Sequence, residues 1–234
     1  MVLESVPPDY FFGGCAWADY DNDGALDLYV TAGYNGTYPD PLMLPLAFLY
    51  HNSGDGTFTK VTDSTVADDP TDGGFPSWVD YDNDGFMDLF VGKAPFNSPP
   101  TPNKLYHNDG NANAWLNVKL VGTATNRSAI GAKVRVKAFY RGKSRWQLRE
   151  ISGGDSNDNQ QSLNAEFGLA DATIIETVRV KWPSGMVQEL HDVAPRQFLT
   201  ITETAVPEPG FALSLVSGLA LVTGLRLRRK QRSR

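Results

Sequence analysis

Residues 17–30 read WADYDNDGALDLYV, and residues 78–91 read WVDYDNDGFMDLFV. The two stretches share a tryptophan, four aspartates, a glycine and a Leu-aromatic-Val ending at the same spacing. A stretch repeated in this way indicates consecutive supersecondary units that stack on one another. The duplication therefore predicts a chain built from at least two similar units.

The aspartates of each stretch have the spacing of ligands around a hard cation. They occupy alternate positions, so their side chains converge if the backbone curls around an ion, and Gly24 permits the sharp turn by adopting a positive φ. Ca²⁺ prefers about six to eight oxygen ligands, whereas Mg²⁺ keeps several of its waters. We expect two calcium sites with these ligands: Asp19, Asp21, Asp23, the Ala25 carbonyl and Asp27, and then Asp80, Asp82, Asp84, the Phe86 carbonyl and Asp88.

An EF-hand and an ordinary turn can also contain acidic stretches of this kind. An EF-hand needs a glutamate at the twelfth loop position, where this chain has Val30 and Val91, and it needs flanking helices. Residues 26–30 and 87–91 alternate instead with β-branched and aromatic side chains, which is typical of strands. Clusters of Asp, Asn and Gly form ordinary turns as well, but a turn does not require all four acids to be duplicated.

Other segments of the first half are repeated as well. Residues 49–52 and 105–108 both read LYHN, and residues 54–58 read GDGTF. With the acidic loops, these segments resemble the FG-GAP/VCBS repeat family. The resemblance implies that residues 1–112 form two four-stranded β-propeller blades, each with a calcium loop.

A complete propeller has about four to eight blades, so two blades make a partial propeller. Three arrangements are open: partner chains complete the ring, the two blades form an open pair, or the natural protein begins upstream of Met1. Residues 1–8 lack the basic start and apolar stretch of a secretion signal. Our hypothesis is a truncated or miscalled start, which the upstream coding sequence tests.

Residues 113–204 form the second predicted domain. The segment shows the period-two alternation of strands and no convincing amphipathic helix, which predicts an antiparallel β domain with one face in water. The expected strands cover residues 114–122, 132–140, 146–151, 177–182 and 198–202, with a turn at Arg141-Gly142-Lys143.

Five motifs of this domain resemble the ASPIC/UnbV family. They lie at residues 115–120, 126–132, 149–151, 167–169 and 180–185. The chain departs from the family pattern at residues 153–161, which lack an aromatic-Ser-Gln sequence, and at Ala165-Glu166, where a histidine is usual. The resemblance implies an architecture, and no ligand role is carried over to this loop.

The C-terminal segment, residues 205–234, has the layout of a sorting signal. Pro207, Glu208 and Pro209 precede an apolar run over residues 211–225, and a basic tail follows. This order resembles the PEP-CTERM signal of Gram-negative bacteria. It implies processing by an exosortase-type enzyme after transient anchoring through a short hydrophobic helix, with the basic flank kept in the cytoplasm. As a helix the run is about 22 Å long, which is short for a bilayer that needs about 20 residues.

Charge and residue types limit the functions that fit this chain. Residues 1–112 carry 17 acidic and 3 basic residues, which argues against nucleic-acid binding. The single cysteine, Cys15, cannot form an internal disulfide; it is expected to be buried in a strand, although an intermolecular bridge stays open. His51 and His107 occupy equivalent repeat positions, which favours a structural role. Trp17 and Trp78 are expected in the blade core rather than on a sugar-binding surface.

The sequence therefore predicts an all-β, calcium-binding protein that is exported to the cell surface or extracellular matrix and mediates adhesion. Its expected partners are an unidentified extracellular protein or polysaccharide, and no nucleic acid. No recognisable nucleophile, zinc-protease or phosphate-binding motif occurs, so no enzymatic activity is expected. Two alternatives remain: an extracellular enzyme acting on polysaccharide, and a truncated structural fragment without activity of its own.

Overall fold

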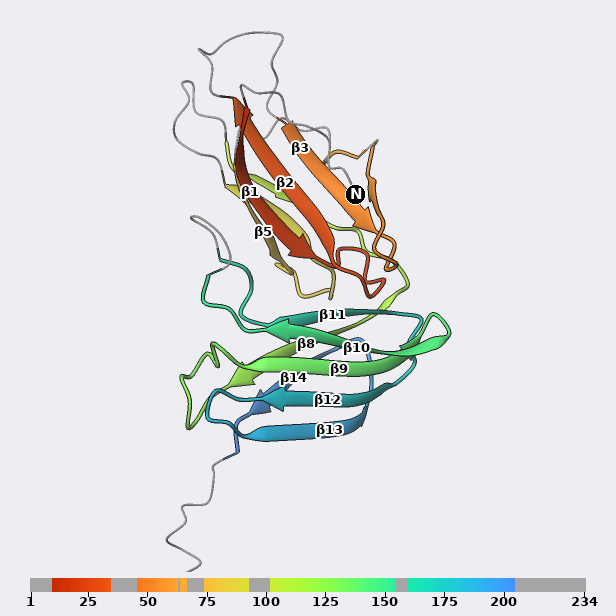
Figure 1. Cartoon of the computed structure of the whole chain (residues 1–234), viewed down its shortest axis with the longest axis vertical. Helices are drawn as coiled ribbons and strands as arrows, with labels where there is room; N and C mark the ends of the chain where they lie inside the picture. Colours follow the sequence, from red (N-terminus) through yellow and green to blue (C-terminus); the bar gives the residue numbers. More distant parts are fainter. Residues whose placement is uncertain are drawn as a thin grey trace, which may run out of the picture. The chain divides into compact units, whose positions relative to one another are not determined.

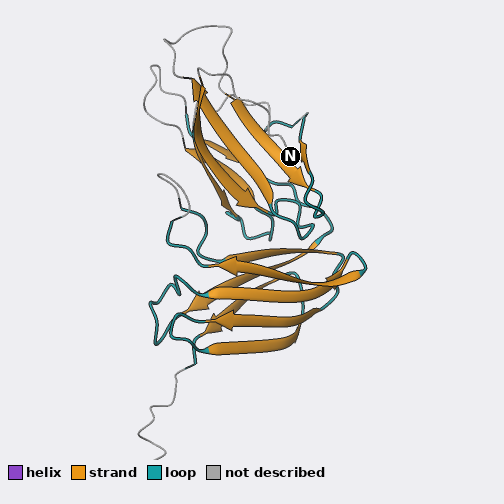
Figure 2. Ribbon diagram, in the orientation of Figure 1, coloured by secondary structure: helices purple, strands orange, loops and turns teal. Residues whose placement is uncertain are grey.

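The computed structural model describes residues 10–34, 46–62, 64–66, 74–92, 102–154 and 160–204. These residues form fourteen β-strands and no helix, which confirms the all-β prediction (Figure 2). The predicted C-terminal helix and the Pro207-Glu208-Pro209 motif lie outside the described residues. Among the described residues, none forms a helix with the length and apolar character needed to cross a bilayer.

The first repeat forms a four-stranded antiparallel meander (Figure 1). Its strands are β1 (Tyr10–Ala18), β2 (Asp27–Tyr34), β3 (Leu46–Asn52) and β4 (Phe58–Lys60). The acidic loop connects β1 to β2, so the predicted loop between strands is confirmed. Segment 49–52, which reads LYHN, ends β3 and leads into the short hairpin to β4.

The second repeat forms a shorter meander of the same order. Its strands are β5 (Phe75–Val79), β6 (Asp88–Gly92) and β7 (Lys104–Tyr106), each antiparallel to the next. The second acidic loop again connects the first two strands. The duplicated sequence therefore folds twice into the same local arrangement.

The two meanders share one apolar core. The side chains that the first meander places in this core come from other positions of the repeat than those from the second meander. Trp78, Leu89 and Val91 of the second meander pack with Ala16, Tyr29 and Leu49 of the first. Because successive strand side chains point to opposite faces, the residues next to each core position face outward.

This packing corrects two predictions. Trp78 is buried, as expected, but its repeat equivalent Trp17 is 48% exposed. Cys15 lies in strand β1 as predicted, but its side chain is exposed rather than buried. Both residues flank Ala16, which faces the shared core, so they lie on the opposite face of β1.

Residues 114–202 form two further sheets. One has the order β10-β9-β12-β13, and the other has the order β11-β8-β14. The strands are β8 (Ala114–Val121), β9 (Lys133–Tyr140), β10 (Lys143–Glu150), β11 (Ala165–Ala170), β12 (Ile175–Lys181), β13 (Val187–Val193) and β14 (Gln197–Thr202).

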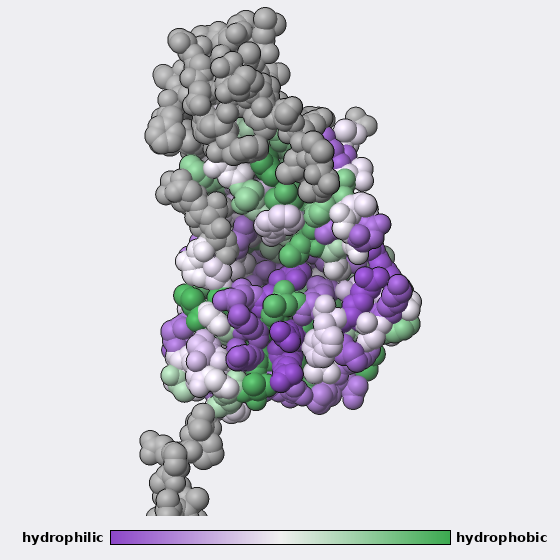
Figure 3. Space-filling view, viewed as in Figure 1, coloured by the Kyte–Doolittle hydropathy of each residue, from purple (hydrophilic) through white to green (hydrophobic). Residues whose placement is uncertain are grey.

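The inner faces of these two sheets form a second core. Its largest members include Trp182, Phe167, Leu116 and Ile175, all 1% exposed or less. The alternating pattern of β9, with Val134, Val136 and Ala138 inside, follows the sequence prediction. In Figure 3 the face turned to the viewer, which carries the sheet β10-β9-β12-β13, is mostly hydrophilic, with hydrophobic residues interspersed.

One strand pair departs from the predicted antiparallel domain. Strand β14 runs parallel to β8, with Gln197 opposite Leu116 and Thr202 opposite Val121. The chain enters β14 from β13, which belongs to the other sheet, so no tight hairpin forces the antiparallel direction. The turn predicted at Arg141-Gly142-Lys143 is confirmed for its first two residues, which have positive φ in the two-residue hairpin between β9 and β10, whereas Lys143 already begins β10.

The end of β14 is held by a carboxylate that the sequence did not single out. Glu203 Oε2 accepts hydrogen bonds from the backbone N–H groups of Thr123, Ala124 and Thr125 at 2.9–3.0 Å. Its Oε1 accepts the hydroxyl of Ser184 at 2.6 Å. Burial raises the pKa of Glu203, but these hydrogen bonds outweigh it and bring the pKa to about 2.

Candidate metal centres

The first acidic loop is organised by its own backbone N–H groups. Asp19 accepts hydrogen bonds from the N–H groups of Asp23 and Gly24, both at 2.8 Å. Asp27, at the start of β2, accepts the N–H of Tyr20 at 3.2 Å and that of Asn52 at 2.8 Å. The loop thus winds around its carboxylates, as the spacing predicted.

The second acidic loop repeats this hydrogen-bond pattern. Asp80 accepts from the N–H groups of Asp84 and Gly85 at 3.1 and 3.0 Å. Asp88 accepts from Tyr81 at 3.1 Å and from Asn108 at 2.8 Å. Each bond has its equivalent in the first loop, so the two loops are built alike.

The backbone conformations agree as well. Asn22 and Asn83 have φ of 56° and 62°, and Gly24 and Gly85 have φ of 96° and 92°. Asparagine and glycine tolerate this left-handed region better than other residues. The positive φ predicted for the loop glycine is confirmed.

We call the predicted ligand residues of the first loop cage 1 and those of the second loop cage 2. The carboxylates do converge, in sets whose ligand atoms lie within 4.8 Å of one another. In cage 1 one such set is Asp19, Asp21 and Asp27; in cage 2 it is Asp80, Asp82 and Asp84. Ala25 and Phe86 take part through their N–H groups, which donate to Asp23 and Asp84 at 2.8 Å. The roles of their carbonyl oxygens remain predictions.

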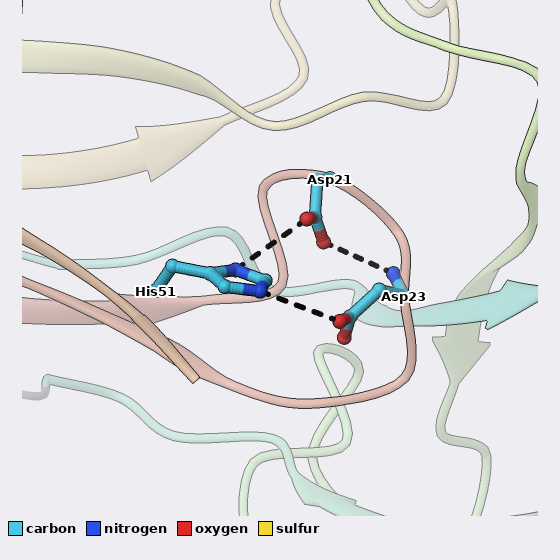
Figure 4. A group of neighbouring side chains, drawn as sticks. All are labelled: Asp21, Asp23 and His51. Carbon is cyan, nitrogen blue, oxygen red and sulfur yellow. Dashed lines mark hydrogen bonds and ion pairs between the residues drawn. The ribbon is translucent and has the colours of Figure 1, made fainter. Parts of the chain in front are cut away.

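A histidine also lies beside each cage, His51 at cage 1 and His107 at cage 2; the repeated position of these histidines in the sequence had favoured a structural role. Nδ1 of His51 lies 3.2 Å from Asp27 Oδ1 and 3.5 Å from Asp21 Oδ2. Figure 4 shows the imidazole edge turned toward the carboxylates of Asp21 and Asp23. Further sets of possible ligands are therefore Asp21, Asp23 and His51 in cage 1 and Asp82, Asp88 and His107 in cage 2. The signal in the sequence was the repeated LYHN segment.

Burial makes the negative charges of cage 1 costly. The pKa of Asp27 is raised to about 8, chiefly by burial; the charges of Asp21 and Asp23 also raise it, and the hydrogen bonds from Asn52 and Tyr20 lower it. Burial also raises the pKa of Asp19, with Asp23 and Asp27 adding repulsion. Carboxylates in this situation are stabilised by a cation held between them.

The two cages differ in their surroundings. Asp19 and Asp23 of cage 1 are buried, whereas their equivalents Asp80 and Asp84 in cage 2 are half-buried and exposed; Asp27 and Asp88 are buried in both cages. Oδ2 of Asp23 pairs with the guanidinium of Arg141 at 2.7 Å. Cage 1 is therefore partly neutralised by an arginine, while two carboxylates of cage 2, Asp82 and Asp84, are exposed to solvent.

Aromatic side chains lie against both loop glycines. A Cβ added at Gly24 would meet the ring of Tyr140, and one at Gly85 would overlap the indole of Trp115. The loops also touch each other, since Nδ2 of Asn22 donates to the carbonyl of Gly85 at 3.0 Å. The glycines are thus needed for close packing as well as for φ.

A cavity of about 360 Å³ lies beside cage 1. Trp17, Trp78, Arg149 and Glu166 are among its lining residues, together with Asp19. Burial raises the pKa of Glu166 to about 7, and its Oε1 has no hydrogen-bond partner. The volume falls at the lower end of the range for small-molecule sites, about 300–1,000 Å³.

Comparisons with known proteins agree with two of the three resemblances, those to the FG-GAP repeat and to ASPIC/UnbV. Residues 19–91 match the family model of the FG-GAP-like repeat, and residues 122–208 match the model of ASPIC and UnbV. Cartilage acidic protein 1 of Mus musculus is 27% identical over 192 residues, which cover 82% of this chain and 28% of that protein. The Homo sapiens protein is 27% identical over 191 residues, covering 81% and 27%. The chain thus spans little more than a quarter of the length of these relatives.

Proposed function

We propose that the protein binds two calcium ions, one in each cage, and that the ions hold the β1–β2 and β5–β6 loops in shape. The observation that carries the proposal is the duplicated loop, with the same positive φ values and the same carboxylate hydrogen bonds in both copies. An ordinary turn needs neither four acids nor buried carboxylates. Ca²⁺ supplies the positive charge that the buried oxygens of cage 1 lack.

The proposed context is the outside of a cell. The FG-GAP-like repeat and the similarity to cartilage acidic protein 1 support an extracellular or surface protein of the adhesion type. The C-terminal Pro207-Glu208-Pro209 signal, if processed by an exosortase-type enzyme, delivers it there. In this setting calcium is abundant, and the partner is an extracellular protein or polysaccharide.

We also propose that the two meanders are blades of a β-propeller, as the family resemblance implies. Support comes from the way the two meanders stack. The face that the second meander turns toward the shared core carries Trp78, whereas the equivalent face of the first meander, which carries Trp17, points away from that core. In the second meander, Phe90 and Leu105 are 37% and 52% exposed, whereas their equivalents Tyr29 and Leu49 are buried. Phe90 and Leu105 therefore lie where a following blade would pack.

A second candidate function, an enzyme acting on polysaccharide, rests on the cavity beside cage 1. Glu166 is a carboxylate with a raised pKa, the property of a general acid. Trp17 offers an exposed aromatic face in the same cavity. Saccharide turnover that is lost in Glu166→Gln and retained in Asp82→Ala would favour this function over binding alone.

Calcium titration with thermal unfolding tests the main proposal. A ligand at 100 times its Kd that binds only the folded state stabilises it by about 2.7 kcal/mol, which corresponds to roughly 5–11 °C for a chain of this size. Asp82→Ala should reduce this shift. Asp109→Ala, which removes a fully exposed acid near cage 2, is the matched control. Identical melting curves in calcium and in chelator would refute the proposal.

A further inference from the structure

The outer face of the sheet β10-β9-β12-β13 carries a row of basic side chains. Val134 and Val136 of β9 point into the core, so the residues between them point outward. In Figure 3 this face is turned toward the viewer. We call the outward-pointing residues of this sheet the basic face. Lys137 is half-buried and the other cations of the face are exposed; the cations are Lys133, Arg135, Lys137, Arg179 and Lys181.

The strand register of the basic face places like charges directly opposite one another. In the pairing of β9 with β12, Arg135 lies opposite Arg179 and Lys133 lies opposite Lys181. Like charges at opposite positions destabilise a sheet. The stability of the sheet therefore does not account for these pairs, whereas an anion lying across them would relieve their repulsion.

The positive charge of this face is only partly compensated. Three of the cations have a carboxylate partner on the same sheet: the ion pairs are Lys133–Glu150 at 3.4 Å, Lys137–Glu176 at 2.7 Å and Arg179–Glu189 at 3.2 Å. Within the described part of the chain, the side chains of Arg135 and Lys181 make no ion pair and no hydrogen bond. These two cations are therefore available to an external anion.

Large apolar side chains border the cations. Trp146 of β10 lies opposite Lys137, and Leu148 lies opposite Arg135. Trp146 and Leu148 are 51% and 46% exposed, and Phe139 near the end of β9 is 56% exposed. Large apolar residues that gather on one exposed face mark an interaction site. The face therefore suits a ligand that has both apolar ring surfaces and negative charges.

We propose that the basic face binds an acidic polysaccharide, a sugar polymer whose units carry carboxylate or sulfate groups. The C–H surface of a sugar ring packs on the indole of Trp146, and the acidic groups bind Arg135 and Lys181, since a guanidinium pairs with such anions through two N–H groups. Neighbouring strands lie about 4.8 Å apart, close to the length of one sugar unit in an extended chain. The inference rests on the extracellular setting proposed above, and it names the class of partner.

The carboxylates of the face favour a polysaccharide over a nucleic acid. Glu150, Glu176 and Glu189 lie among the cations and can accept hydrogen bonds from sugar hydroxyls, but they repel a polymer with a phosphate at every unit. Five basic and three acidic side chains leave the face with a net charge of only +2. Since Trp146 would also stack on an unpaired base, a single-stranded oligonucleotide is included in the test.

The test is calorimetric titration of the whole chain with sodium alginate, a polymer of uronic acids, in the presence of chelator. Chelator removes calcium that would bridge alginate to the acidic loops. We expect alginate to bind and dextran, an uncharged polymer, not to bind. The variant Arg135→Gln/Lys181→Gln should weaken alginate binding at least about 10-fold. Trp146→Ala should weaken it about 3–10-fold, which attraction between charges alone would not produce.

Matched controls change the same kinds of side chain elsewhere. Lys119→Gln/Arg127→Gln removes two exposed positive charges that lie outside the basic face. Phe198→Ala removes an exposed aromatic side chain from β14 of the other sheet. Both variants should bind alginate as the unsubstituted chain does. The single variant Arg135→Gln replaces the glutamine pair if that pair does not fold.

Three results would overturn the inference: no alginate binding, an equal loss of affinity in the control variants, or tighter binding of a thymine oligonucleotide with the same number of charges. Localisation of the protein separates this inference from the setting on which it rests. A chain that stays inside the cell but binds alginate through Arg135 and Trp146 rejects the extracellular setting and keeps the basic face. An exported chain that does not bind alginate does the reverse.

Discussion

Two glycines have the same positive φ but different surroundings, so substituting each of them by alanine distinguishes the free-energy cost of the backbone conformation from that of steric overlap with neighbours. Gly56 and Gly85 both have φ of 92°. A Cβ at Gly56 would have no heavy atom within 4 Å, whereas one at Gly85 would overlap the indole of Trp115. Alanine at either position should destabilise the protein because its backbone stays left-handed. Only alanine at Gly85 must also displace the indole of Trp115.

The magnitudes follow from these two effects. The left-handed backbone costs a non-glycine residue about 1–2 kcal/mol, and overpacking a filled site costs about 1–3 kcal/mol more. Gly56→Ala should therefore lower the free energy of unfolding by about 1–2 kcal/mol, and Gly85→Ala by about 2–5 kcal/mol. For a chain of this size that is roughly 2–8 °C and roughly 4–20 °C in Tm.

The assay is calorimetric unfolding in the presence of chelator, so that changes in ion affinity at cage 2 do not contribute. The decisive comparison repeats Gly85→Ala in a Trp115→Ala background, where only the backbone cost should remain. Equal losses for Gly56→Ala and Gly85→Ala, or no relief in the Trp115→Ala background, would refute the packing argument.

Single contacts lead to three more expected outcomes. Trp78→Ala should lower the free energy of unfolding by about 3–5 kcal/mol because it leaves a cavity in the shared core, whereas Trp17→Ala should lower it by less than about 1 kcal/mol. Chemical denaturation measures both values, and equal losses would contradict the assignment of Trp78 to the core face and of Trp17 to the outer face. The pKa of Glu203 is lowered to about 2, so its stabilisation is fully present above the unfolded value near pH 4.5 and is lost as the pH falls through 2. Glu203→Gln should lower the free energy of unfolding at pH 7 by about 2–3 kcal/mol and reduce its dependence on pH below about 4.5. If this dependence is unchanged in the variant, the Glu203 carboxylate is not stabilised by the N–H groups of Thr123–Thr125. In the calcium proposal, Asp27→Asn should weaken calcium binding at cage 1 and leave cage 2 intact, which calcium titration with a count of sites measures.

Local spacing made much of the structure predictable. The acidic loops, their glycine turns and the strands on either side depend on residues within about a dozen positions of one another, so the sequence pattern specifies them directly. The same holds for the Arg141-Gly142 hairpin and for the alternating core face of β9. The carboxylates of each cage could be grouped in advance because one loop carries most of them.

Contacts between distant segments decided the rest. His51 enters cage 1 because β3 pairs with β2, which brings residue 51 beside Asp27. Trp17 and Trp78 have the same local sequence but opposite environments, since a sheet buries the face on which its neighbour packs. The parallel pairing of β14 with β8 and the contacts of Glu203 with Thr123–Thr125 depend on where the chain returns after crossing to the other sheet. The sequence alone determined which ligand, aromatic and turn residues each repeat carries. The tertiary structure determined which of these residues are buried and which lie in contact, because burial and contact depend on neighbouring strands that are distant in the sequence.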